Sequence, residues 1–195
     1  MPKIEEAQEI LKSLGLPPAQ QNEISALTLL ALVNIAPNDP WKKSERLRRS
    51  VSKDIMDFIA KTYRKTYAPN TRETVRRQVL HQFIQAKIAD YNPFEPDLPT
   101  NSPRAHYAIT ENALEVIRTY GTKSWNGAAA QFIASHGSLA ETYALHRSQG
   151  KLVPLRLPDG KEITLSPGKH NIVQKAIIEE FAPRFLHNPG VLWLS

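Results

Sequence analysis

The chain has 195 residues, a net charge of +6 at pH 7 and 41% hydrophobic residues, so it can bury one or two hydrophobic cores. It contains no cysteine, which excludes disulfides and cysteine-based zinc sites and fits a reducing cytoplasm. The N-terminus is too polar for a secretory signal and no apolar run is long enough to cross a bilayer, so we expect a cytoplasmic protein without a membrane partner.

Three helices are predicted in the first third of the chain. Residues 3–14 have the spacing of an amphipathic helix, which Gly15 ends. Residues 21–35 are strongly apolar and predict the central core helix, and Trp41 after them predicts an aromatic anchor at one end of the core. Residues 52–66 place apolar side chains at helical spacing and predict the third helix.

Residues 71–86 predict an amphipathic helix, which we term the candidate recognition helix. Asn70, followed three residues later by Glu73, has the pattern of a capping box at its start. One face is apolar, whereas the opposite face is rich in basic and amide side chains. Arg can bind guanine and Gln can bind adenine through two hydrogen bonds each. We therefore expect five side chains of this face to contact DNA bases: Thr74, Arg77, Gln78, His81 and Gln85.

A β-hairpin is predicted after this helix. Residues 88–92 and 106–110 have the composition of short strands, and the segment between them is rich in Pro, Asn and Asp. A helix followed by a hairpin is typical of a winged helix-turn-helix, in which the helix enters the major groove and the hairpin forms the wing. The helix predicted at residues 52–66 would then be the first helix of the helix-turn-helix.

The positive charge is concentrated before and within the candidate recognition helix. Between Lys42 and Arg77 there are twelve Lys and Arg residues against four acids, a net charge of +8. Such a localised charge favours a polyanionic partner, here duplex DNA. A solvated basic helix pair and an interaction module that binds no nucleic acid are the alternatives. On the DNA hypothesis, six cations contact phosphates: Lys61, Arg64, Lys65, Arg72, Arg76 and, in the hairpin loop, Arg104.

The remainder of the chain predicts a second domain. We predict three helices at residues 111–120, 125–135 and 138–147, followed by two strands at residues 152–157 and 162–165. A further helix at residues 169–181, which Pro183 ends, and a last apolar strand at residues 191–194 complete the chain. The composition changes after the third of these helices. We therefore expect a helical domain at residues 1–148 and a second domain at residues 149–195.

No complete catalytic or metal-binding set is evident. The chain has no Gly-rich phosphate loop and no His-Glu-x-x-His sequence, and its histidines lack metal-ligand spacing. Glu179 and Glu180 lie on the last predicted helix. Lys175 and Glu179 are four residues apart and favour a solvated ion pair on its surface.

Several runs resemble one known family. YAPNTRETVRRQVLHQF at residues 67–83 is the most specific, supported by residues 101–103, 157–168 and 176–185. From about Leu27 onward the chain resembles the BsuBI/PstI family of type II restriction endonucleases. The resemblance implies a mainly α fold with small β-hairpins, in which a winged helix-turn-helix domain precedes an α/β nuclease domain of the PD-(D/E)XK type.

The resemblance also implies an activity and its requirements. Family members cut duplex DNA at a short palindrome, CTGCAG in the best-known members, with Mg²⁺ and beside a matching methyltransferase. A palindromic site implies a homodimer. We expect this chain to match the DNA-binding part and only the opening of the nuclease domain, and hence to bind DNA without cutting it and without a cofactor. Glu179 or Glu180 would be the acid that such nucleases often hold on a helix. A free-standing winged-helix transcriptional regulator is the alternative.

Overall fold

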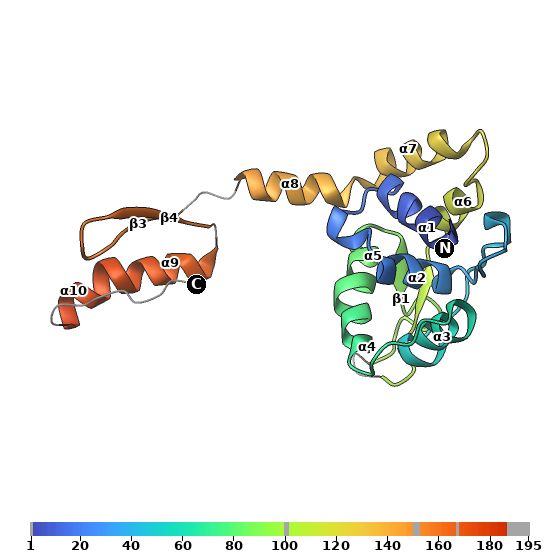
Figure 1. Cartoon of the computed structure of the whole chain (residues 1–195), viewed down its shortest axis with the longest axis horizontal. Coiled ribbons are helices and arrows are strands. Elements are labelled where there is room, and N and C mark those ends of the chain that lie inside the picture. Colours follow the sequence, from blue (N-terminus) through green and yellow to red (C-terminus); the bar gives the residue numbers. More distant parts are fainter. Residues whose placement is uncertain (1, 100–101, 150–152, 167, 187–195) are drawn as a thin grey trace. The chain divides into compact units, whose positions relative to one another are not determined.

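The computed structural model of the chain describes residues 2–99, 102–149, 153–166 and 168–186 (Figure 1). Its contacts divide the chain into two compact units, Met1–Tyr143 and Ala144–Ser195. The described residues are mainly helical and include two small antiparallel hairpins, as predicted. The proposed domain boundary after residue 148 stays a prediction, and the strand predicted at residues 191–194 lies outside the described residues.

The N-terminal unit begins with helix α1 (Pro2–Ser13), a 3-10 turn η1 (Pro18–Gln20) and helix α2 (Glu23–Leu32). Asn22 caps α2, because its side-chain oxygen accepts a hydrogen bond from the Ser25 N–H at 3.0 Å. Beyond Val33 the backbone of Asn34 turns left-handed, with φ of +59°. These two ends make α2 shorter than the predicted residues 21–35.

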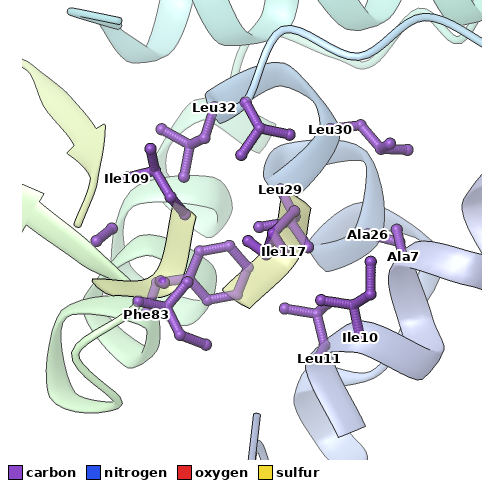
Figure 2. Close-up of a cluster of buried hydrophobic side chains, with 14 of the residues drawn as sticks. Ala7, Ile10, Leu11, Ala26, Leu29, Leu30, Leu32, Phe83, Ile109 and Ile117 are labelled. Carbon is purple, nitrogen blue, oxygen red and sulfur yellow. The ribbon is translucent and has the colours of Figure 1, made fainter. Parts of the chain in front are cut away.

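Helix α2 is the central core helix, as predicted. Its apolar residues from Ala26 to Leu32 are fully buried. Figure 2 shows side chains of α2 beside Ile10 and Leu11 of α1 and beside Phe83, Ile109 and Ile117, which come from three later elements. One contiguous cluster therefore joins elements from the whole N-terminal unit, and it holds the candidate recognition helix against α2.

Trp41, in the 3-10 turn η2 (Trp41–Lys43), is an anchor for the end of the core. Its side chain is 4% exposed, and its indole N–H donates to Glu6 Oε2 at 2.6 Å. The Tyr120 ring packs edge-on against it at 5.7 Å between centroids. The buried indole is therefore both packed and hydrogen-bonded, which confirms the prediction.

Two helices then lie at the positions predicted for the helix-turn-helix pair. The first is continuous through the π-helical segment η3 (Val51–Met56) and α3 (Asp57–Tyr63), and it ends where Arg64 turns left-handed. The second, the candidate recognition helix, is continuous from Thr71 to Gln85 through α4 (Thr71–Thr74), η4 (Val75–Leu80) and α5 (His81–Gln85). The two helices contact each other and pack on α2.

The predicted capping box at Asn70 is wrong. The Asn70 backbone is already helical, with φ of −68° and ψ of −19°, and its side chain makes no cap hydrogen bond. A side-chain cap requires an extended backbone at that position. Glu73 instead accepts hydrogen bonds from Arg76 and Arg77 on the next turn of the same helix.

The first hairpin consists of strands β1 (Ala89–Tyr91) and β2 (Tyr107–Ile109). Ala89 pairs with Ile109 and Tyr91 with Tyr107, in antiparallel register. The strands are shorter than predicted. Arg49 adds a third extended segment, because its backbone exchanges two hydrogen bonds with Tyr107, at 2.9 and 2.8 Å. This bridge ties the basic segment before η3 to the hairpin.

Three helices complete the unit: α6 (Glu111–Arg118), α7 (Trp125–His136) and α8 (Leu139–Gln149), which runs into the second unit. Thr110 caps α6, as predicted, because its Oγ1 accepts the Ala113 N–H at 3.2 Å. No helix in the described ranges is long and apolar enough to span a membrane.

The C-terminal unit contains the hairpin β3 (Val153–Arg156) and β4 (Glu162–Leu165), followed by α9 (Lys169–Ala176), the π-helical η5 (Ile177–Phe181) and α10 (Ala182–Phe185). The prediction that Pro183 ends the last helix is wrong, since the helix continues to Phe185. Pro183 lies inside this continuous helix, two residues after the π-helical segment η5. The apolar face predicted for this helix is exposed within the unit: Ile172, Val173, Ile177 and Phe181 are each more than half exposed.

Candidate nucleic-acid interface

The polar face of the candidate recognition helix is open to solvent. Arg77, Gln78, His81 and Gln85 are exposed and Thr74 is half-buried. The opposite face, including Val79 and Phe83, is buried in the core. The helix therefore presents its basic and amide side chains outward on a rigid support, as a groove-binding helix must.

Glu73 joins the two consecutive arginines of this helix. Its Oε2 accepts a hydrogen bond from Arg76 Nη2 at 3.1 Å and another from Arg77 Nε at 2.9 Å. These bonds lower the pKa of the Glu73 carboxyl, so it stays ionised at neutral pH, and the same contact raises the pKa of Arg76. Both guanidinium groups are thereby held on the first half of the helix.

A hollow of about 540 Å³ lies between the candidate recognition helix and the first hairpin. Its lining combines cationic, imidazole, aliphatic and phenolic side chains: Arg76, Arg77, His81, Ile84, Tyr91 and Tyr107. The rings of Tyr91 and Tyr107 pack at 5.2 Å between centroids. Burial raises the pKa of Tyr107, so this phenol stays protonated at neutral pH. The hollow can therefore both donate hydrogen bonds and accept apolar groups.

The hollow brings together only part of the predicted base-contacting set. Arg77 and His81 line it, and Arg76, which we expected to contact phosphate, lines it as well. Thr74, Gln78 and Gln85 are not among its lining residues. Gln85 lies at the far end of the helix, where its side-chain oxygen accepts a hydrogen bond from the Tyr143 hydroxyl at 2.9 Å.

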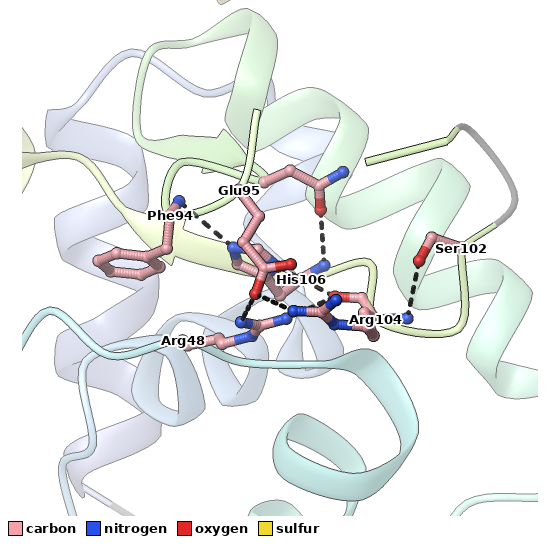
Figure 3. A network of polar contacts seen from close by, with 7 residues as sticks. Arg48, Phe94, Glu95, Ser102, Arg104 and His106 are labelled. Carbon is pink, nitrogen blue, oxygen red and sulfur yellow. Dashed lines mark hydrogen bonds and ion pairs between the residues drawn. The ribbon is translucent and has the colours of Figure 1, made fainter. Parts of the chain in front are cut away.

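The hairpin loop is built around a buried histidine and an acid (Figure 3). His106 is 1% exposed, and its backbone N–H donates to the Asn92 side chain at 2.8 Å. His106 Nε2 accepts the Phe94 N–H at 3.4 Å, while Nδ1 lies 3.0 Å from the Arg104 carbonyl oxygen. These contacts hold the ring in one orientation. The Phe94 ring stacks on it at 5.7 Å.

Glu95 binds one arginine of the loop and one from a distant segment. Its carboxylate accepts a hydrogen bond from Arg48, which lies 47 residues earlier, and another from Arg104 at 2.7 Å. Arg48 also donates to the Arg104 carbonyl oxygen at 3.0 Å. Figure 3 shows the two guanidinium groups beside the one carboxylate. Hydrogen bonds and charge from the two arginines lower the pKa of the Glu95 carboxyl. Arg104 is exposed and available to a phosphate.

The other predicted phosphate contacts lie on or beside the helix-turn-helix. Lys61 pairs with Asp57 at 3.4 Å on the surface, and Lys65 with Glu23 at 3.1 Å. Arg64 and Arg72 are exposed. Exposed ion pairs contribute at most about 1 kcal/mol, so they do not prevent these cations from binding a phosphate.

The two candidate catalytic acids are placed differently in the C-terminal unit. Glu179 accepts the Arg156 N–H at 2.8 Å and lies 3.5 Å from Lys175, which itself donates to the Pro154 carbonyl oxygen. Glu180 is exposed. Neighbouring helical residues diverge by about 100°. Within the described ranges, no three His, Cys, Asp or Glu side chains are grouped so that they could hold a metal ion.

Sequence reasoning missed the partners of the arginines. The Glu73–Arg77 spacing of four residues is the signal that could have shown the first contact, because side chains four apart on a helix are neighbours. No comparable signal exists for Glu95, because its partner Arg48 lies 47 residues earlier and only the folded chain brings the two together. The same holds for Tyr91, because its place in the hollow depends on the hairpin register.

Comparisons with known proteins match both units. A family model described as "BsuBI/PstI restriction endonuclease HTH domain" matches residues 1–141, and one described as "BsuBI/PstI restriction endonuclease domain" matches residues 153–195. The chain is 46% identical to the type II restriction enzyme BsuBI of Bacillus subtilis, over 96% of its own length. It is 25% identical to the type II restriction enzyme AplI of Arthrospira platensis, over 92% of its length.

A solved structure, that of the SdaI restriction endonuclease, resembles the fold with a TM-score of 0.66 and 34% sequence identity over 98% of this chain. The chain spans 58% and 55% of the lengths of BsuBI and AplI, and 60% of the SdaI chain.

Proposed function

The chain belongs to the BsuBI/PstI restriction endonuclease family, and we propose that its N-terminal part, residues 1–148, binds duplex DNA sequence-specifically for a type II restriction enzyme. The observation that carries this proposal is the candidate recognition helix, whose apolar face is buried while Arg77, Gln78 and His81 face solvent. A rigid helix with such side chains suits the major groove, where arginine and glutamine distinguish base pairs.

The arrangement supports a winged helix-turn-helix. Helix η3–α3 (residues 51–63) would cross the phosphate backbone, the candidate recognition helix would enter the major groove, and the β1–β2 hairpin would form the wing. Base contacts are assigned to Thr74, Arg77, Gln78, His81 and Gln85. Phosphate contacts are assigned to Lys61, Arg64, Lys65, Arg72, Arg76 and Arg104.

Replacement of Arg77 by Ala should weaken binding to the preferred duplex by about 1–3 kcal/mol and reduce the sequence preference, because Arg77 donates to a base edge. Replacement of Lys65 by Ala should weaken binding to all sequences about equally, because a phosphate contact carries no sequence information. Fluorescence anisotropy with a duplex carrying CTGCAG and with a shuffled duplex measures both effects.

Thermal melting of both variants provides the control, since both side chains lie at the surface, with exposed fractions of 72% for Arg77 and 44% for Lys65. Equal losses on the two duplexes for both variants would refute the division into base and phosphate contacts. A regulator that shares the helix-turn-helix is the alternative function, but the nuclease-domain match at residues 153–195 favours the restriction enzyme.

For the whole enzyme we propose Mg²⁺-dependent cleavage of a short palindrome by a homodimer in the cytoplasm. The residues described here do not fit a complete Mg²⁺ site. Glu179 is already bound by the Arg156 N–H and lies beside Lys175, and Glu180 diverges from it on the helix. Either acid would need ligands from elsewhere in the enzyme, because a catalytic metal requires converging carboxylates.

We therefore expect the chain alone to bind DNA without cutting it. Incubation with Mg²⁺ and a plasmid carrying CTGCAG should leave the DNA intact over hours, as judged by gel electrophoresis. A full-length relative such as BsuBI serves as the control for the buffer and the plasmid. Discrete Mg²⁺-dependent fragments that disappear in Glu179→Ala or Glu180→Ala would contradict this expectation.

A further inference from the structure

The candidate recognition helix contains one acid among its basic side chains. Between residues 71 and 86, Glu73 is the only Asp or Glu, against Arg72, Arg76 and Arg77. A DNA-binding helix gains non-specific affinity from each positive charge, and it loses affinity through a carboxylate near phosphates. The Glu73 carboxylate therefore lowers the affinity for DNA unless its contacts with neighbouring side chains compensate for the loss.

The Glu73 carboxylate is directed at two of the side chains that line the hollow. One oxygen, Oε2, accepts hydrogen bonds from Arg76 Nη2 and Arg77 Nε, at 3.1 and 2.9 Å. The exposed fractions of the three side chains are 50% for Glu73, 45% for Arg76 and 72% for Arg77, so the contact lies at the surface that DNA would approach. It is not needed to fill or close the core.

The contact uses only part of the Arg77 guanidinium group. An arginine has five N–H donors in a fixed plane. When Arg77 donates through Nε, its two Nη groups remain as a fork, and such a fork matches the O6 and N7 acceptors of guanine. A side chain held in one orientation before binding loses less entropy when it binds. The contact therefore prepares Arg77 for a base edge.

The same carboxylate disfavours a different partner. A phosphate that approaches the Arg77 guanidinium also approaches the negative charge of Glu73, whereas a base edge is neutral. The other side chains that line the hollow, among them His81, Ile84 and Tyr91, offer both hydrogen bonds and apolar surface, which suits a base edge better than an anion.

We propose that Glu73 is a specificity-determining residue, which positions Arg77 for a base edge and weakens the contacts of Arg77 with phosphates of arbitrary sequence. The inference rests on the proposed DNA-binding function. Glu73 acts through Arg77, so it is a positioning residue rather than a base-contacting one. Its removal should raise non-specific affinity while it lowers discrimination.

The test compares wild type with Glu73→Gln, which removes the charge at nearly constant size. The preferred duplex is first selected from a random pool with the wild-type chain, and affinity for it and for a shuffled duplex is measured at fixed salt. Glu73→Gln should bind the shuffled duplex about 3–10-fold more tightly, with a salt slope steeper by about 0.9, as expected for one further phosphate contact. Affinity for the preferred duplex should change less than about twofold, so the preference falls.

Two controls separate the effect of the position of Glu73 from the effect of a change in net charge. Glu115→Gln makes the same change in net charge on α6, outside the candidate recognition helix and the hairpin, and should leave the preference unchanged. In an Arg77→Ala background, Glu73→Gln should alter the preference much less than in wild type, because its partner is gone. Thermal melting of Glu73→Gln should match wild type, since the carboxylate lies at the surface.

The outcomes are distinct. If the wild-type chain binds and selects a sequence, and Glu73→Gln has the same preference, the proposed role of Glu73 is overturned and the proposed function stands. An equal shift in Glu115→Gln also overturns it, because net charge alone would then explain the effect. A wild-type chain that does not bind DNA overturns the proposed function and this inference together.

Discussion

Raising the salt concentration from about 50 to about 200 mM should weaken DNA binding by this chain roughly 250- to 1000-fold. The physical reason is the charge concentrated between Lys42 and Arg77, which is +8 in a chain whose net charge is +6. If about five phosphates are neutralised, log K falls with log salt at a slope of roughly −4 to −5 as counterions are released. Fluorescence anisotropy across a salt series measures the slope.

Arg104→Ala supplies a matched test within the same titration. Arg104 is exposed on the hairpin loop and oriented by Glu95, so its loss should reduce the slope by about 0.9, the value for one phosphate. Circular dichroism at both ends of the series controls for unfolding by salt. A flat response in the wild-type chain would contradict the DNA-binding proposal and favour an interaction module that binds no nucleic acid.

Replacing Phe83 by Ala should destabilise the N-terminal unit by about 3–5 kcal/mol, as for other buried phenylalanines. The ring belongs to the candidate recognition helix and is completely buried beside Leu29 and Ile117 (Figure 2). Its removal leaves a cavity at the point where this helix packs on α2. Because domains are stable by only about 5–15 kcal/mol, a large part of the stability would be lost.

Thermal melting followed by circular dichroism measures this loss, which should lower the midpoint by roughly 10 °C or more. Gln78→Ala is the matched control on the same helix, because its side chain is exposed and such a change alters stability by at most about 0.5 kcal/mol. The first variant should also lose DNA affinity as it unfolds. A midpoint within about two degrees of wild type would show that Phe83 does not hold the candidate recognition helix in place.

Much of the fold could be predicted from local patterns. The apolar run that became α2, the helical spacing of residues 71–86 and the cap at Thr110 each depend on residues within one or two turns of one another. The basic and amide face of the candidate recognition helix follows from the same periodicity, because a helix that buries Val79 and Phe83 must expose the residues between them. The family resemblance also rests on contiguous runs.

Local patterns failed where two local solutions compete. Asn70 and Glu73 have the spacing of a capping box, but Glu73 also lies three and four residues before two arginines. Two arginines give Glu73 two charge-assisted hydrogen bonds on its own helix, and the helical backbone at Asn70 removes the cap geometry. Pro183 likewise predicts a helix end, but the helix continues past it to Phe185.

The amino-acid sequence by itself determined the helices, the outward face of the candidate recognition helix and the concentration of positive charge. Only the tertiary structure decided how the basic side chains are held. Arg48 and Arg104 meet at Glu95, and Arg49 bridges to Tyr107. The periodicity of apolar residues indicates which face of a helix or strand is buried, because that face repeats within a few residues. Contacts between segments far apart in the sequence depend on how the elements pack, and no repeating pattern in a single sequence indicates them.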